Sequence, residues 1–123
     1  MRRLIAALPG SRESQARNRA LVAVLYWPAL RVSEALALTG RDLDEGTLRI
    51  TVAAADAGGR VLPLEGGARD LVPAWATVRA GLGHGPDAPL FPTRSGERLD
   101  AGYVRALLTR AARAAGLGIP VSA

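Results

Sequence analysis

The residues in this chain that are best suited to bind or act on a ligand are its arginines. All 16 of its basic residues are arginine, against 11 acidic ones, which gives a formal net charge of +5 over 123 residues. A guanidinium stays protonated and offers paired hydrogen bonds to phosphate oxygens. The positive balance therefore favours a polyanionic partner, most often nucleic acid. A GC-rich genome that writes Arg codons in place of Lys codons remains an alternative explanation for the arginine count, but not for the positive balance.

Other kinds of chemistry are poorly provided for. The chain has no cysteine and a single histidine, His84, so the sequence predicts no disulfide, no thiolate or histidine-rich metal centre and no cofactor. No apolar run reaches the ~18 residues that a membrane span needs. The start, MRRLIAALPG, is interpreted as a short helix over 1–8 rather than a signal peptide. We therefore expect a cytoplasmic protein with no membrane partner and no small-molecule substrate.

The elements expected to position the arginines begin with two helices. The segment 18–27 is almost wholly apolar, which is typical of a central helix buried on all sides, and Pro28 ends it. A second helix is predicted over 31–38, with Val32, Ala35 and Leu36 on one face. Alternation over 47–52 predicts a half-buried strand, and 60–64 a second strand. Pro63 places that second strand at an edge.

Two longer helices are predicted to follow this hairpin. One covers 70–82, and its Pro73 fits only in a first turn. Asp100 caps the other. The predicted inward positions are Leu71, Trp75, Val78 and Leu82 in the first of these helices, and Val104, Leu107, Leu108, Ala111 and Ala115 in the last, with Arg105, Arg110 and Arg113 outward. The fold class is mainly α with a small antiparallel β-hairpin, in a single domain over 1–123.

Three stretches in order carry a family resemblance. The segment 19–38 contains Leu30-Arg31-Val32-Ser33-Glu34 between a buried helix and a Leu-rich one. Arg60-Val-Leu-Pro-Leu64 ends the hairpin. Pro89-Leu-Phe-Pro92 and Gly96 precede a helix that ends in Ala114-Ala-Gly-Leu117. Together they resemble the catalytic domain of the tyrosine recombinase (phage integrase) family.

The resemblance implies roles for individual residues. Arg31 takes the place of the family's first catalytic arginine, which would stabilise the phosphoryl transition state of strand cleavage. Glu34 would orient Arg31; a solvated charge or a helix-end carboxylate are the alternatives. Arg31, Arg49, Arg60 and Arg105 are the expected DNA contacts.

Other parts of the family pattern are not matched. The hairpin lysine that serves as general acid would fall near Ala55, and the chain has no lysine. The His-x-x-Arg box and the nucleophilic tyrosine would come after residue 123. Pro28-Ala29 replaces the usual Thr-Gly before the arginine. The sequence is therefore interpreted as a truncated integrase-like catalytic core.

The remaining candidate side chains receive structural interpretations. Tyr26 is expected to be a core or boundary aromatic. Tyr103 comes too early to be the nucleophile and is expected to pack or to face DNA. His84, in a glycine loop, is expected at the surface.

The predicted function is weak, sequence-blind binding of double-stranded DNA by an inactive recombinase remnant that is not an enzyme on its own. A fragment of an active recombinase, an interaction module that docks on an intact recombinase, and an unrelated α-helical DNA-binding regulator are the alternatives. An apolar stripe at Val104, Leu107, Leu108 and Ala111, left uncovered by missing later helices, predicts a homodimer.

Overall fold

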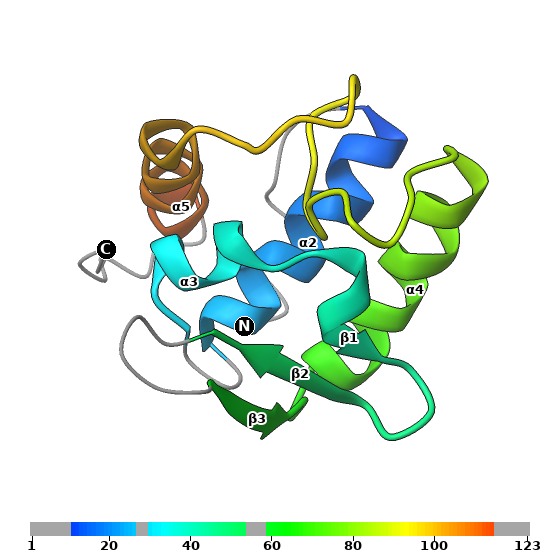
Figure 1. Cartoon of the computed structure of the whole chain (residues 1–123). Helices are drawn as coiled ribbons and strands as arrows, with labels where there is room; N and C mark the ends of the chain where they lie inside the picture. The colour runs from blue at the N-terminus through cyan, green and yellow to red at the C-terminus, as the bar shows by residue number, and fades with distance from the viewer. Residues whose placement is uncertain (1–10, 27–29, 54–58, 115–123) are drawn as a thin grey trace.

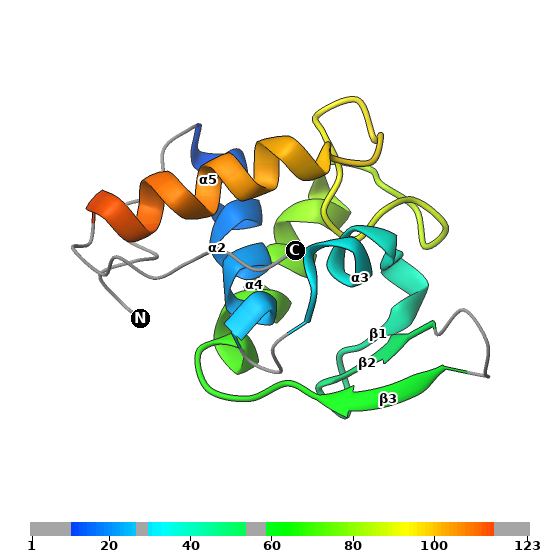
Figure 2. The same ribbon diagram turned by 90° about the vertical axis from the view of Figure 1, so that its left-hand side faces the viewer.

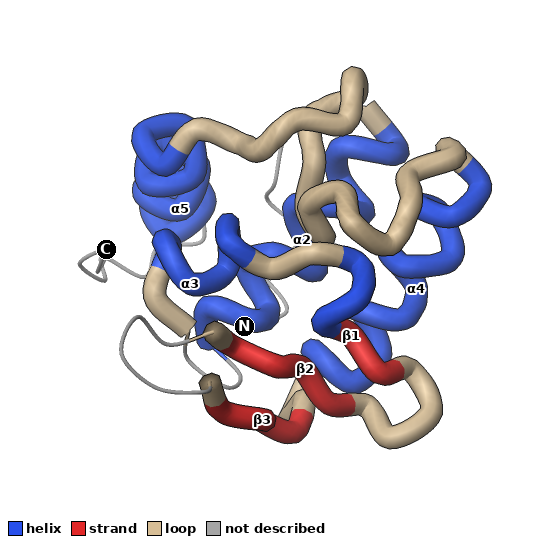
Figure 3. The backbone as a smooth tube through the Cα atoms, in the orientation of Figure 1, coloured by secondary structure: helices blue, strands red, loops and turns tan. Residues whose placement is uncertain are grey.

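The computed structural model describes residues 11–26, 30–53 and 59–114, and its architecture is mainly helical (Figures 1 and 3). The elements in chain order are α2 (Arg12–Tyr26), α3 (Val32–Ala37), the 3₁₀ turn η1 (Gly40–Asp42), β1 (Leu43–Asp44), β2 (Arg49–Val52), β3 (Arg60–Pro63), α4 (Ala68–Gly81) and α5 (Ala101–Ala114). The predicted fold class is confirmed. The predicted helix over 1–8 lies outside the described residues. Over the described ranges, no helix is both long and apolar enough to cross a membrane.

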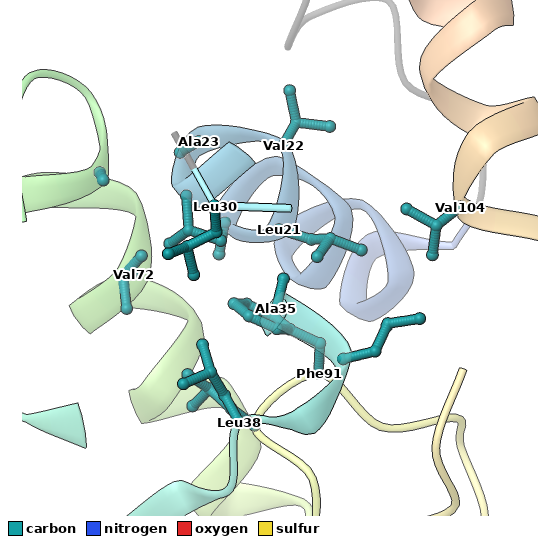
Figure 4. Packing of buried hydrophobic residues seen from close by; sticks show 14 of the residues in the cluster. Leu21, Val22, Ala23, Leu30, Ala35, Leu38, Val72, Phe91 and Val104 are labelled. Carbon is teal, nitrogen blue, oxygen red and sulfur yellow. The ribbon is translucent and has the colours of Figure 1, made fainter. Parts of the chain in front are cut away.

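Helix α2 is the centre of the core, as its apolar sequence predicts. Its residues 20–24 have no exposed surface. The helix lies between α5 on one side and α4 on the other (Figures 1 and 2). In the close-up, Val104 points from α5 toward Leu21 of α2, while Val72 and Phe91 approach the same cluster from α4 and the later loop (Figure 4). A helix apolar on every face is stable only in such a position, because each face is covered by another element.

The sheet has three antiparallel strands in the order β1-β2-β3 rather than the two of the predicted hairpin. Ile50 and Val52 are buried, and β3 with Pro63 lies at the edge, as predicted. Thr47 and Leu48, however, belong to a turn. The Asp44 carboxylate accepts the N–H groups of Gly46 and Thr47 at 3.0 and 3.2 Å. That local side-chain turn reverses the chain before Arg49, which lets 43–44 pair as an extra strand.

The predicted apolar stripe of α4 is wrong in part. Trp75 is buried, but Leu82 is 48% exposed, and Arg79 occupies the inner face instead. The helix also begins at Ala68, two residues earlier than predicted, so Pro73 is its sixth residue and lies beyond the first turn. The early start has a local cause, since the carbonyls of residues 66 and 67 accept the N–H groups of residues 69–71. The buried residues of α4 are Ala68, Val72, Trp75 and Arg79, whereas the predicted Leu71 and Val78 are only partly buried at the border of the core.

Helix α5 begins where the sequence places it, and its apolar stripe is closed. The Asp100 carboxylate accepts the Tyr103 N–H at 3.1 Å, which caps the helix. Val104 and Leu107 are fully buried and Leu108 is 7% exposed within the single chain. The side chain of Ala111 and the whole of Ala115 lie outside the described part. The expectation of an open stripe is therefore wrong for these leucines and Val104. An uncovered stripe on α5 therefore no longer supports the homodimer. The homodimer stays a prediction, which sedimentation equilibrium can test.

Candidate functional site

Arg31 is presented to solvent by the backbone that precedes α3. It is the N-cap residue, in extended conformation with φ −74° and ψ 155°. In an extended segment neighbouring side chains point to opposite sides. Leu30 and Val32 are 4% and 1% exposed, so both are anchored in the core and Arg31 between them is exposed. The Leu30 N–H also donates to the Val24 carbonyl at 3.0 Å, which ties this segment to α2.

Glu34 connects the start of α3 to the sheet. Its Oε1 accepts the backbone N–H of Arg31 at 3.0 Å, and its Oε2 accepts from the Arg60 guanidinium at 2.9 Å. The backbone hydrogen bond from Arg31 is the main reason that the pKa of Glu34 lies below its ordinary value; Arg60 adds to this, and partial burial opposes it. Glu34 is thus a helix-end carboxylate, one of the alternatives above. It fixes the backbone of Arg31 and the side chain of Arg60.

Arg60 is placed by a backbone position that only glycine fits. It opens β3 opposite Val52. Gly59 before it has φ +84°, and a Cβ there would lie 2.8 Å from the Val52 carbonyl oxygen. The Arg60 side chain remains 48% exposed while it pairs with Glu34. We call Arg31, Glu34 and Arg60 the α3–β3 cluster.

Two predicted DNA contacts lie apart from the α3–β3 cluster. Arg49 is exposed at the opposite end of the β2–β3 ladder, opposite Pro63. Arg105 is exposed on α5. Neither takes part in the two ion pairs found among the described residues. Ala55 and Pro28-Ala29 lie outside those residues. Within the described ranges no three potential metal ligands come together.

Two arginines that the sequence analysis did not single out are buried. Arg17 is 8% exposed and Arg79 is 7% exposed. Arg79 donates to four backbone carbonyls of one loop, with donor–acceptor distances from 2.7 to 3.4 Å: those of His84, Gly85, Ala88 and Pro89. Burial lowers the pKa of Arg79. The signal was present in the helical period, because Arg79 follows Trp75 by four residues and shares its face.

Arg17 is the centre of a second network of polar side chains inside the fold. Its Nε donates to the Asn18 side chain at 3.1 Å, and one terminal nitrogen donates to the Pro92 carbonyl at 3.2 Å. The Tyr103 hydroxyl lies 3.4 Å from the other terminal nitrogen and 3.5 Å from the Asn18 amide. The Tyr103 ring stacks near the guanidinium, 6.0 Å from its carbon. Packing is therefore the role that the geometry gives Tyr103.

The other two candidates are also structural. Tyr26 is partly buried against the core, as expected. His84 is half-buried rather than free at the surface, because its ring lies against the backbone of Gly96, where an added Cβ would be 3.4 Å from Nδ1.

Comparisons with known proteins agree on one family. The model of the phage integrase family matches residues 1–122. A tyrosine recombinase XerC of Rhodospirillum centenum is 35% identical over 100 residues, and one of Pseudomonas putida is 36% identical over 92 residues. These matches cover 81% and 72% of this chain but only 29% of each relative's length.

Solved structures share the fold. The XerA recombinase superposes with a TM-score of 0.79 at 23% identity, over 98% of this chain and 42% of that one. The XerH site-specific recombinase, bound to its difH substrate, gives 0.77 at 25% identity, over 97% of this chain and 35% of that one. The part of the fold that carries the α3–β3 cluster is therefore shared with recombinases.

Proposed function

The chain belongs to the phage integrase family of tyrosine recombinases, and we propose that it is a DNA-binding part of a site-specific recombinase catalytic domain. The observation that carries the proposal is Arg31: it is exposed between two buried residues and its backbone is fixed by Glu34. The planar guanidinium can place two parallel hydrogen bonds on one phosphate. Where strand cleavage takes place, the same donors would stabilise the charge that develops on the phosphoryl oxygens.

Glu34 and Arg60 act as the support for this arginine. Because Glu34 accepts from the Arg31 backbone and from Arg60 at once, it fixes the distance between the start of α3 and the start of β3. Arg60 is half-exposed and supplies a second cation beside Arg31. Arg49 and Arg105 add further phosphate contacts from separate elements. Binding of this kind reads the DNA backbone and carries little sequence information.

The proposal is tested by titrating a labelled DNA duplex with the chain at several salt concentrations and measuring fluorescence anisotropy. We expect dissociation constants of about 10⁻⁴–10⁻⁶ M that do not depend on sequence and rise steeply with salt. Arg31→Ala should weaken binding to every duplex and lower the salt slope by about 1. Arg98→Ala removes the same charge from an exposed loop position and should have the smaller effect.

Two results would overturn this assignment. Equal affinity for DNA at low and high salt would show that binding does not depend on contacts with phosphate. Equal losses from Arg31→Ala and Arg98→Ala would show that only net charge matters and that the α3–β3 cluster is no site.

We further propose that these 123 residues alone do not cleave DNA. A transition-state arginine acts together with a positioned acid and nucleophile, and removal of any member of such a unit abolishes most of the activity. Support comes from the two tyrosines: Tyr26 packs against the core, and the Tyr103 hydroxyl is engaged by Arg17 and Asn18. A covalent adduct on a suicide DNA substrate that disappears with Tyr103→Phe would contradict the proposal.

A further inference from the structure

The connection from α3 to β1, residues 38–42, joins the two parts of the α3–β3 cluster, and we call it the α3–β1 connection. Arg31 and Glu34 lie at the start of α3. Arg60 opens β3, which β2 joins to β1 in the sheet. Because α3 has only six residues, fewer than two turns, a shift at its end moves its start as well. The position of the connection therefore helps to set how Arg31 lies relative to Arg60.

The α3–β1 connection is held by the loop 84–89 and by the residue that follows this loop (Figure 1). Three backbone hydrogen bonds of 2.8 to 3.0 Å run between them: the Leu90 N–H donates to the Leu38 carbonyl, the Gly40 N–H to the Ala88 carbonyl and the Arg41 N–H to the Pro86 carbonyl. The connection is therefore fixed only as firmly as the loop itself.

The loop is fixed in turn by Arg79 of α4. The Arg79 guanidinium donates to four carbonyls of this loop. It also lies against the connection, because a Cβ at Gly40 would be 2.7 Å from one of its terminal nitrogens. Trp75, one turn earlier in α4, is 2% exposed and donates from Nε1 to the Leu90 carbonyl at 2.7 Å. Arg79 thus links a well-anchored part of α4 to both the loop and the connection.

We propose that Arg79 is a positioning residue for Arg31. By fixing the loop 84–89 it holds the α3–β1 connection, and the connection holds Arg31 in the position beside Arg60 that phosphate binding needs. The inference rests on the proposed DNA-binding function, since phosphate is the ligand of that function. Arg79 acts through these other residues, because its guanidinium is 7% exposed and its donors are taken by the loop.

The first test is a nuclear magnetic resonance measurement on the full chain labelled with ¹⁵N, without DNA. Arg79→Lys keeps the positive charge, but one ammonium group cannot replace a planar guanidinium that bonds four carbonyls. The backbone amide resonance of Arg31, which Glu34 bonds, should move in Arg79→Lys as it does in Glu34→Gln. Arg69→Lys changes an exposed arginine of the same helix and should leave this resonance in place. Lower stability alone does not move a resonance of the folded chain, so the shift reports position.

The second test measures DNA binding by the same variants, with fluorescence anisotropy at one low salt concentration. Arg79→Lys should raise the dissociation constant for a duplex about threefold, a size typical of a residue that acts through others. The net charge does not change, so the non-specific attraction to DNA is the same in both chains. In an Arg31→Ala background, Arg79→Lys should cause no further loss, because the side chain that it positions is absent. Arg69→Lys should bind DNA like the wild-type chain.

Gly40→Ala produces the same displacement by another route and replaces Arg79→Lys if that variant does not fold. Its Cβ would press on the guanidinium, whereas a Cβ at Gly81 meets nothing within 4 Å, which makes Gly81→Ala the control. An Arg31 amide resonance that stays in place, an unchanged affinity for DNA, or equal losses of affinity with and without the Arg31 side chain would each overturn the inference. If the resonance moves but the wild-type chain shows no salt-dependent DNA binding, the positioning of Arg31 is supported and the proposed function fails.

Discussion

Arginine side chains play different parts in two regions of the molecule. The first region is the α3–β3 cluster, and the second is Arg79 with the loop 84–89. In the cluster, Arg60 pairs with a carboxylate and stays 48% exposed, and Arg31 faces solvent. Arg79 is 7% exposed and donates to four backbone carbonyls of one loop. The exposed guanidinium groups of the cluster can turn toward a phosphate. If the guanidinium of Arg79 moved, the loop carbonyls that it bonds would lose their donor. Burial and the kind of acceptor thus separate the arginines that we propose bind DNA from a structural one.

The two regions should also differ in how much they stabilise the fold. An exposed ion pair contributes about 0–1 kcal/mol, because water and salt screen it. A buried donor that satisfies several carbonyls contributes more, since its removal leaves acceptors desolvated and unpaired. Four experiments test this difference, from the largest expected effect to the smallest.

Arg79→Ala should lower the free energy of unfolding by about 3 kcal/mol, because it leaves several buried carbonyls unpaired and a cavity beside Trp75. Urea denaturation followed by circular dichroism measures the loss. Arg69→Ala, an exposed arginine of the same helix, is the matched control and should change stability by less than about 0.5 kcal/mol. Similar losses of unfolding free energy for the two variants would show that Arg79 stabilises the fold no more than an exposed arginine does.

Gly40→Ala tests how firmly Arg79 is held. A Cβ at Gly40 would lie 2.7 Å from a terminal nitrogen of Arg79. Because the guanidinium is fixed by the loop carbonyls, we expect a loss of about 1–2 kcal/mol rather than a free side-chain adjustment. At Gly81, the last residue of α4, an added Cβ meets nothing within 4 Å. Gly81→Ala should therefore be neutral or stabilise by about 0.5 kcal/mol. Thermal unfolding distinguishes the two, and a neutral Gly40→Ala would mean that Arg79 is loosely held.

The Glu34–Arg60 pair should show a small coupling. A double-mutant cycle of Glu34→Gln and Arg60→Gln should give an interaction free energy of about 0.5–1 kcal/mol in dilute buffer, and less at high salt. The Arg41–Asp87 pair, with side chains 67% and 84% exposed, is the comparison and should couple less. If salt did not change the interaction free energy of Glu34 and Arg60, this pair would behave like the buried contacts of Arg79 rather than like an exposed ion pair.

The smallest effect concerns pH. The folded pKa of Glu34 lies below its ordinary value of 4.5, so ionised Glu34 stabilises the folded chain. This contribution is complete above the unfolded pKa and is lost as pH falls through the folded pKa. The difference in unfolding free energy between the wild-type chain and Glu34→Gln should therefore be constant near neutral pH and shrink in acid below 4.5. A difference that grows in acid would give the shift the wrong sign.

Local patterns were enough for most of the secondary structure. The apolar run over 18–27 predicted the central helix, and Pro63 predicted the edge strand, because each depends on residues next to one another. The helix predicted over 31–38 was found as α3, and Arg31, the first residue of that prediction, is its N-cap. Asp100 capped α5 as expected, since a cap is satisfied within three residues.

Long-range partners were decided only by the tertiary structure. Glu34 bonds to Arg60, 26 residues away, and Arg17 reaches Tyr103, 86 residues away. The type of residue shows that a guanidinium needs acceptors, but not which distant segment supplies them. Arg17 and Arg79 could be buried only because folding brings Tyr103, Pro92 and the loop carbonyls to them. The sequence determined which side chains could bind an anion; packing determined which of them remain available to do so.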